Sequence, residues 1–137
     1  MEEKKIEAGA EWAPRVYEIE RGMLQPFVQA IDDPNPRWQE GERDAIAPPT
    51  FAVTLGLEQM LQILAQAPAA TILHGSTELE CYQPVRVGDT IMVRTKVSSV
   101  RERQGKMGKM SFVTFDITCE NQRQELVARC RQMIINY

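Results

Sequence analysis

The sequence predicts an α+β domain in which one long helix lies against a curved antiparallel sheet. Residues 50–66 show helical spacing of apolar residues, and from residue 73 onward the chain carries strand signals separated by short links. Strands joined by short links pair antiparallel, and this helix is long enough to cover one face of their sheet. At 137 residues the chain suits a single domain spanning residues 1–137, with a frayed end at residues 1–11.

Two short elements are expected before the long helix. Residues 15–20 predict a strand in which apolar and polar side chains alternate. Residues 23–31 predict a helix, in which Pro26 is tolerated only within the first turn. The apolar stripe of this helix recurs at four-residue steps and consists of Met23, Phe27 and Ile31.

A stiff loop is expected over residues 32–42, which are rich in proline and acidic residues. Pro34 and Pro36 each push the preceding residue towards extended geometry. Asp33 and Asn35 therefore lie on a non-helical segment with little freedom. Such rigidity suits a functional site, and it suits an inert turn equally well.

The long helix and the strands after it carry the predicted core. Apolar residues fall on one face of the helix, and Gln59, Gln62 and Gln66 lie mostly away from it. The residues of that face are Val53, Leu57, Met60, Leu61 and Leu64. Strands are expected at residues 73–82, 91–97, 113–119 and 126–131, with hairpin-like links at 104–108 and 121–124.

Composition and charge disfavour several classes of protein. Hydrophobic residues make up 43% and charged residues 26% of the chain, and a net charge of -3 gives no reason to expect nucleic acid as a partner. No apolar run approaches the ~18 residues of a membrane span and no signal peptide is evident, so a cytoplasmic protein is expected. The three cysteines predict buried, reduced thiols, and the single histidine predicts no metal site; no cofactor is expected.

Residues 33–38 read Asp-Pro-Asn-Pro-Arg-Trp, which resembles the Asp-x-Asn-Pro-x-His signature of the MaoC-like (R)-specific enoyl-CoA hydratases and 3-hydroxyacyl dehydratases. Asp33, Asn35 and Pro36 match this signature, whereas Trp38 stands in place of the histidine. Later segments resemble the same family in the same order, and they look most like its FAS1-like dehydratase, or MaoC N-terminal, branch. These segments are Ala-Pro-Pro-Thr-Phe at 47–51, Leu-His-Gly at 73–75 and Gln-Pro-Val-Arg-Val-Gly-Asp at 83–89.

The resemblance covers nearly the whole chain and implies a hot-dog fold, in which the curved sheet wraps round the central helix. In the branch concerned, one hot-dog unit often lacks the catalytic pair and works beside a second unit that has it. The resemblance therefore implies an acyl-CoA or acyl-carrier-protein thioester as ligand, and a homodimer or a heteromer with a second hot-dog subunit. Pairing also has a physical motive, because a strongly bent sheet leaves an edge strand open.

Catalytic roles for Asp33, Asn35 and His74 follow from the resemblance. In the active hydratases an aspartate and a histidine hold one water between them, and Asp33 could be that carboxylate. Trp38 cannot replace the histidine, because its indole N–H is a donor only. Alternatively, Asp33 and Asn35 only shape a rigid turn while Trp38 packs on the core or on a partner. His74 could face the substrate groove, or it could simply bind a carbonyl oxygen.

Substrate binding is expected at the start of the central helix. Pro48 and Pro49 remove two backbone donors there, but Thr50 and Phe51 keep theirs, so the thioester is placed beside them. The phosphates of coenzyme A would lie towards basic residues, some of them in a basic hairpin at residues 94–109 whose charges could equally be solvated. The expected substrate-binding residues are Trp38, Thr50, Phe51, Arg86, Arg101 and Arg103.

Three functions are consistent with these features. The first is a MaoC-like 3-hydroxyacyl-thioester dehydratase or enoyl-CoA hydratase unit that binds substrate beside a second, catalytic hot-dog subunit. A second is a hot-dog acyl-CoA thioesterase that uses Glu58 or Asp33, although Glu58 can equally be solvated or interfacial. A third is a non-catalytic acyl-CoA binding protein, which Trp38 and the two prolines permit.

Overall fold

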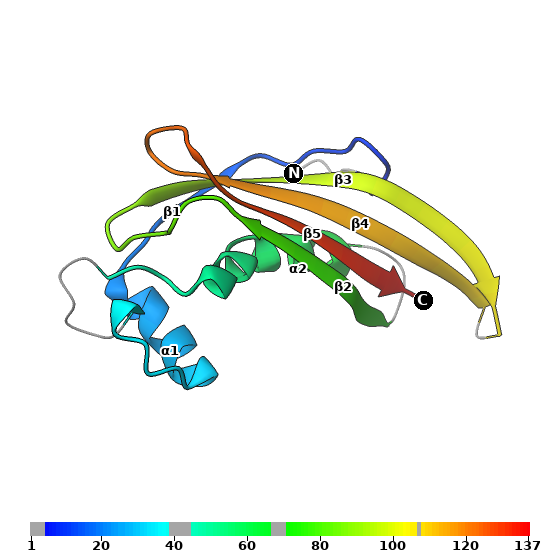
Figure 1. Cartoon of the computed structure of the whole chain (residues 1–137). Coiled ribbons are helices and arrows are strands. Elements are labelled where there is room, and N and C mark those ends of the chain that lie inside the picture. Colours follow the sequence, from blue (N-terminus) through cyan, green and yellow to red (C-terminus); the bar gives the residue numbers. More distant parts are fainter. Residues whose placement is uncertain (1–4, 39–44, 67–70, 107) are drawn as a thin grey trace.

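A computed structural model describes residues 5–38, 45–66, 71–106 and 108–137. A bent antiparallel sheet arches over the central helix, with a second helix beyond one end (Figure 1). The elements in chain order are β1 (Arg15–Glu18), α1 (Arg21–Ile31), η1 (Pro36–Trp38), η2 (Pro49–Gly56), α2 (Leu57–Ala65), β2 (Ile72–Cys81), β3 (Thr90–Gly105), β4 (Gly108–Glu120) and β5 (Leu126–Asn136). The strand order is β1-β3-β4-β5-β2. The expected α+β class and antiparallel sheet are confirmed.

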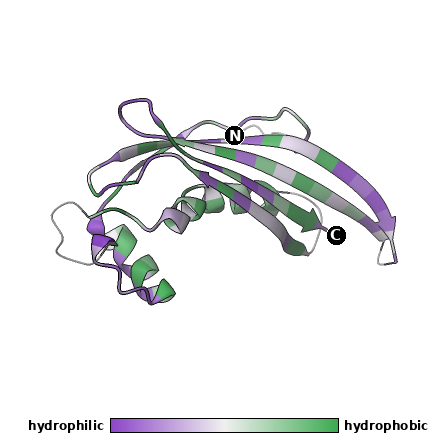
Figure 2. Cartoon of the chain, in the orientation of Figure 1, coloured by the Kyte–Doolittle hydropathy of each residue, from purple (hydrophilic) through white to green (hydrophobic). Residues whose placement is uncertain are grey.

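Alternation along β3, β4 and β5 builds the side of the sheet that faces the helix (Figure 2). Ile91, Val97 and Phe115 are fully buried there, as the two-residue period predicts. Cys119 and Cys130 belong to the same layer, and burial raises the pKa of Cys119 to about 12 and that of Cys130 to about 11. These two thiols therefore stay protonated and pack as small apolar groups, as expected, whereas Cys81 was predicted to be buried and is exposed.

The central helix is continuous from residue 49 to residue 65, but its first half winds as a 3-10 helix. Its buried face differs from the predicted one, because Leu57 and Leu61 are 38% and 47% exposed. Met60 and Leu64 are buried as expected, and the other buried positions are Phe51, Ala52, Leu55, Gly56, Gln59 and Ile63. Gly56 must be small, since a Cβ atom there would lie 2.7 Å from the Ile117 side chain of β4.

Gln59 explains the error in the predicted helix face. Its side chain is 5% exposed and lies between the helix and β3. The Gln59 amide donates to the Ala13 carbonyl at 3.1 Å and accepts from the Thr95 hydroxyl at 3.0 Å. Because both polar atoms are paired, this glutamine is buried without the penalty that its polarity suggests.

The two edges of the sheet differ. Residues 9–12, of which residues 9–11 were expected to fray, extend the cover of β3 beyond β1. Gly9 donates to the Val97 carbonyl and Val97 donates to the Ala10 carbonyl, both at 2.9 Å. β2 ends the strand order on the other side, and all of its residues except Leu79 are exposed. No helix within the described ranges is both long and apolar enough to cross a bilayer.

Candidate functional site

A pocket of about 360 Å³ opens where the loop after α1, the start of the central helix and the end of β2 meet. It therefore lies next to the segment that carries the Asp-x-Asn-Pro sequence. Its lining residues are Asn35, Arg37, Trp38, Ile46, Ala47, Pro48, Pro49, Ala52, Cys81, Tyr82, Gln83, Pro84, Val85, Val127 and Ala128. Of the expected site residues, Asn35 and Trp38 line this pocket.

Asp33 and Asn35 hold the loop in shape through two successive side-chain-to-backbone hydrogen bonds. An Asp33 carboxylate oxygen accepts from the Asn35 N–H at 3.0 Å, and the Asn35 amide oxygen accepts from the Arg37 N–H at 3.0 Å. Such bonds are the usual way in which Asp and Asn stabilise turns. Asp32 ends α1 just before them with a left-handed backbone, at φ 52°. Asp33 is half-buried and is absent from the pocket lining.

Trp38 enters the pocket from the short helix η1. Its indole nitrogen is buried and has no hydrogen-bond partner among the described residues. A buried donor without a partner costs about 1–3 kcal/mol. The position where the resembled signature has a histidine therefore carries an N–H donor that cannot accept a proton.

The helix start contributes apolar surface rather than the two predicted contact residues. Pro48, Pro49 and Ala52 line the pocket. Phe51 instead lies in the core at 4% exposure, edge-on to the Phe27 ring with centroids 5.6 Å apart. The Phe51 N–H donates to the Pro48 carbonyl at 2.9 Å, so that donor is already engaged. Thr50 is exposed and is absent from the lining.

The end of β2 supplies pocket residues that the sequence analysis did not identify. The Cys81 thiol points to the Pro49 carbonyl at 3.7 Å, and burial raises its pKa. The Tyr82 hydroxyl donates to Glu80, and this hydrogen bond is the main cause of the raised pKa of Tyr82. Arg37 is the one cation among the lining residues that the structure describes. The position of Arg37 directly before Trp38 was the sequence feature that could have identified it as a pocket residue.

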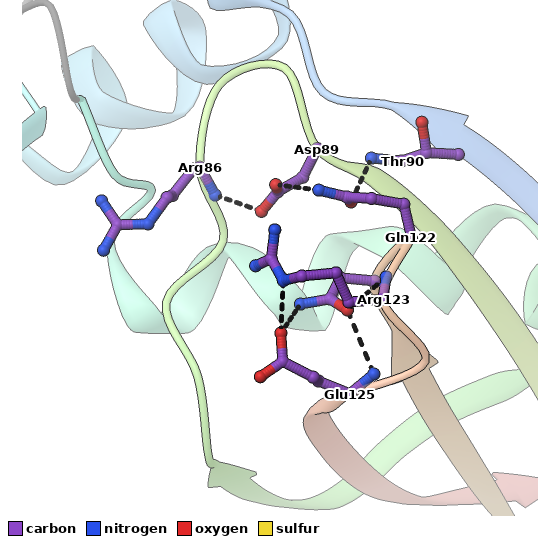
Figure 3. A network of polar contacts seen from close by, with 7 residues as sticks. Arg86, Asp89, Thr90, Gln122, Arg123 and Glu125 are labelled. Carbon is purple, nitrogen blue, oxygen red and sulfur yellow. Dashed lines mark hydrogen bonds and ion pairs between the residues drawn. The ribbon is translucent and has the colours of Figure 1, made fainter.

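Asp89 anchors the link between β2 and β3 beside the pocket (Figure 3). It is 5% exposed, accepts from the Arg86 N–H at 2.9 Å and accepts from the Gln122 amide at 3.0 Å. Gln122 in turn accepts from the Thr90 N–H at 3.0 Å. This network fixes the turn at Gly88, whose φ is +95°, and with it the neighbouring wall residue Val85.

The three predicted arginines do not surround one opening. Arg86 is exposed and follows Val85 at the pocket wall. Arg101 and Arg103 lie on the far arm of β3, eleven and thirteen residues beyond Thr90. At ~3.3 Å per residue, Arg101 is about 36 Å along the strand from its start. One phosphate group cannot contact both ends, and Arg86 is the arginine of the three that directly follows a lining residue of the pocket.

His74 and Glu58 also lie outside the pocket lining. The His74 Nε2 atom lies 2.6 Å from the Gln132 amide oxygen and 2.8 Å from the Thr77 hydroxyl. His74 is seven residues from Cys81, about 23 Å along an extended strand, so it lies well away from the pocket lining. Glu58 is exposed on α2.

Comparison with known proteins gives both the family of this chain and solved structures of the same fold. The backbone superposes with a TM-score of 0.79 on a chain of the HadBC (3R-hydroxyacyl-ACP dehydratase) complex of Mycobacterium tuberculosis, at 23% identity, over 97% of this chain and 98% of that one. This likeness shows the fold. Residues 7–130 match the model of the FAS1-like, dehydratase domain region, and the chain belongs to that family.

Two curated relatives are similar in sequence. A UPF0336 protein of Thermobifida fusca is 31% identical over 103 residues, which are 67% of this chain and 68% of that protein. A probable enoyl-CoA hydratase alpha subunit of Thermomonospora curvata is 24% identical over 84% of this chain, but the match spans only 44% of its own length. The second relative is thus more than twice as long as the part this chain matches.

Proposed function

We propose that this chain is an acyl-thioester-binding unit that works beside a second hot-dog subunit carrying the catalytic residues of a hydratase or dehydratase. The observation that carries the proposal is the chemistry of the pocket lining. Among the lining residues that the structure describes there is no carboxylate and no histidine. The titratable side chains are Arg37, Cys81 and Tyr82, and the pKa values of the last two are raised.

Hydration of an enoyl thioester requires a group that takes or gives a proton near neutral pH. A thiol and a phenol with raised pKa values stay protonated there, and an arginine does not titrate. The nearest candidate base, Asp33, accepts the Asn35 N–H and does not line the pocket. The pocket is therefore suited to holding a substrate, and the proton transfers fall to the partner.

The lining also suits a thioester. Pro48, Pro49 and Ala52 from the start of the central helix and Val127 and Ala128 from β5 give the lining apolar surface that an acyl chain could contact. The Trp38 indole N–H would donate to the thioester oxygen or the 3-hydroxyl, and Arg37 would meet a phosphate outside. The heteromeric and subunit names of the two dehydratase and hydratase relatives support a partner in the same assembly.

Acyl-CoA binding with and without catalysis tests the proposal. The purified chain should bind crotonyl-CoA in calorimetry yet turn it over far below the ~1–1000 per second usual for enzymes. Cys81→Phe, which narrows the pocket, should abolish binding. Leu79→Phe is the matched control, because Leu79 lies on the same strand and the same face but outside the lining. Full hydratase turnover by the chain alone would refute the proposal that the catalytic residues belong to a second subunit. Binding that Cys81→Phe leaves unaffected would refute this pocket as the binding site.

A non-catalytic acyl-CoA binding protein is the second candidate, and the absence of a base from the described part of the lining favours it equally. The two candidate functions predict different effects of a partner on turnover. Adding an extract fraction with hydratase activity should raise turnover in the first case and leave it unchanged in the second. The thioesterase hypothesis gains no support, because Glu58 and Asp33 both lie outside the pocket lining.

A further inference from the structure

The outer face of the sheet, turned away from α2, changes character along its strands (Figure 1). The residues of this face alternate along each strand with the buried ones, and directly opposed residues of neighbouring strands share a face. Towards the start of β3 the outer face is charged, and Arg131 pairs there with Asp116 at 2.9 Å. Towards the β3–β4 hairpin it carries apolar residues and two arginines.

An apolar patch covers the hairpin half of this face. One row of directly opposed residues crosses the four strands and reads Arg101, Phe112, Ile135 and Leu73 from β3 to β2. Val113, next to Phe112, is buried, so the row lies on the outer side. We call this surface the outer patch; it consists of Leu73, Met110, Phe112, Met133 and Ile135 and is bordered on β3 by Arg101 and Arg103. All five apolar residues are at least partly exposed, Leu73 most of all at 47%.

Gly75 on β2 lets the outer patch continue from β5 onto the last strand of the sheet. A Cβ atom at Gly75 would lie 2.6 Å from the Met133 Cε atom and 3.6 Å from the Ile135 Cδ1 atom. Both side chains therefore lie over bare backbone, at the bulge that follows His74. A larger residue at this position would displace them and divide the apolar surface.

Arg101 and Arg103 give the outer patch a positive border. Neither arginine has an ion pair within the described part of the chain. Glu102 lies between them in sequence but on the other side of the strand, where it pairs with Lys109 at 3.0 Å. The described rows that cross the outer patch contain no acid of their own. Two guanidinium groups beside an apolar surface suit carboxylates, which an arginine can bind through two parallel hydrogen bonds.

The composition of the outer patch and its backbone both indicate the kind of partner. Aromatic residues, methionine and arginine are the residue types that protein interfaces enrich. The backbone groups beneath the patch are already paired between strands, so a partner can pack side chains on it but cannot add a strand there. A helix with an apolar stripe is the element that commonly covers the face of a sheet. Acidic residues beside that stripe would complement the two arginines.

We infer that the outer patch docks an amphipathic helix of another protein, whose apolar stripe covers Phe112 and Ile135 and whose acidic residues bind the two bordering arginines. The inference goes beyond the proposed function, because no residue of the patch or its border lines the pocket. A second copy of the chain is a poorer occupant. In a two-fold face-to-face pair, the arginines of each copy would face the β2 side of the other, where Glu78 lies five residues from Leu73, about 16 Å along the strand.

A synthetic helical peptide of about 18 residues, or five turns, serves as the probe. It carries leucines at three- and four-residue spacing and glutamates on both flanks of that stripe. NMR titration should shift the amide signals of β4 and β5 under the outer patch, and added salt should weaken the binding. Arg101→Gln/Arg103→Gln should raise the Kd at least about tenfold. Arg94→Gln/Lys96→Gln, a matched control on the same strand and face, should leave it unchanged.

A charge exchange distinguishes the arginine contacts from unspecific adhesion. The same peptide with lysines in place of glutamates should not bind the unmodified chain, but it should bind Arg101→Glu/Arg103→Glu. Phe112→Thr should abolish binding of the glutamate peptide, and Ile135→Thr gives the same test if that variant fails to fold.

Three results would overturn the inference. The first is no binding of the glutamate peptide at about 1 mM, or equal binding of both peptides. The second is binding of the chain to phosphatidylglycerol vesicles that Arg101→Gln/Arg103→Gln weakens, which would assign the outer patch to a membrane surface. The third is self-association in sedimentation velocity that Phe112→Thr abolishes, which would assign it to a second copy. Crotonyl-CoA binding by the same variants should be unchanged in every case, so it reports on the proposed function alone.

Discussion

Replacing Trp38 with phenylalanine should shift stability and affinity in opposite senses. The change removes the buried indole N–H, whose lack of a partner costs about 1–3 kcal/mol, and loses about 1–1.5 kcal/mol of apolar burial through the smaller ring. The free energy of unfolding should therefore change by between about -0.5 and +2 kcal/mol, which is a net rise at the middle of the range. A ligand oxygen that accepts from this N–H contributes about 0.5–1.5 kcal/mol, so crotonyl-CoA should bind about 2- to 13-fold more weakly.

Urea denaturation and calorimetry measure the two effects, and Trp12→Phe is the matched control. Trp12 is half-buried against the core and is absent from the pocket lining. Its replacement should lower the free energy of unfolding by about 1 kcal/mol and leave the affinity unchanged. If Trp38→Phe destabilises the chain as much as Trp12→Phe and the affinity is unaltered, the indole N–H is not a ligand donor.

Three further outcomes are expected. Arg37→Ala should weaken crotonyl-CoA binding at low salt. Arg101→Ala should not, because Arg101 lies about 36 Å along β3 from the start of the strand. Equal losses of affinity in calorimetry would contradict the placement of the phosphates. Gln59→Met keeps the volume of the side chain but removes two hydrogen bonds, so the free energy of unfolding should fall by about 2 kcal/mol. The control Gln62→Met should lower it by less than about 0.5 kcal/mol. Similar values for both variants would disprove the role of the buried amide. Burial raises the pKa of Cys119 from 9.0 to about 12, so the contribution of this thiol to stability is complete below pH 9 and is lost as the pH rises towards 12. Cys119→Ala should therefore make the free energy of unfolding fall less steeply in this range, by up to about 1.4 kcal/mol per pH unit. An unchanged pH dependence of the free energy of unfolding would contradict the burial of the Cys119 thiol.

The sheet could be predicted because its signal is local. Each strand of the arch alternates with a period of two, so the burial of Val97, Phe115 and Ile117 follows from the residue types alone. The burial of Gln59 could not be predicted, because it depends on partners 36 and 46 positions away along the chain. Polarity alone therefore favoured the wrong side of the helix.

The site was predicted less well than the fold, for a related reason. The loop with Asn35 and Trp38 was identified from its own residues, and both line the pocket. Cys81 and Tyr82 reach the same pocket only because β2 ends beside the helix start, which is a matter of strand register. Phe51 was placed beside the ligand by its neighbours in sequence, but its ring packs on Phe27 in the core.

The paired hydrogen bonds of Asp33 and Asn35 affect how signature matches should be weighed. Both side chains accept hydrogen bonds from backbone N–H groups of the loop, and these bonds form without any substrate. A unit of this fold could lose its proton-transfer chemistry and still need an aspartate and an asparagine at these places to keep the loop in shape. Identity at those two positions then measures the geometry of the turn, and under the proposed function the residue at position 38 is the one that would distinguish a working hydratase from a binding module.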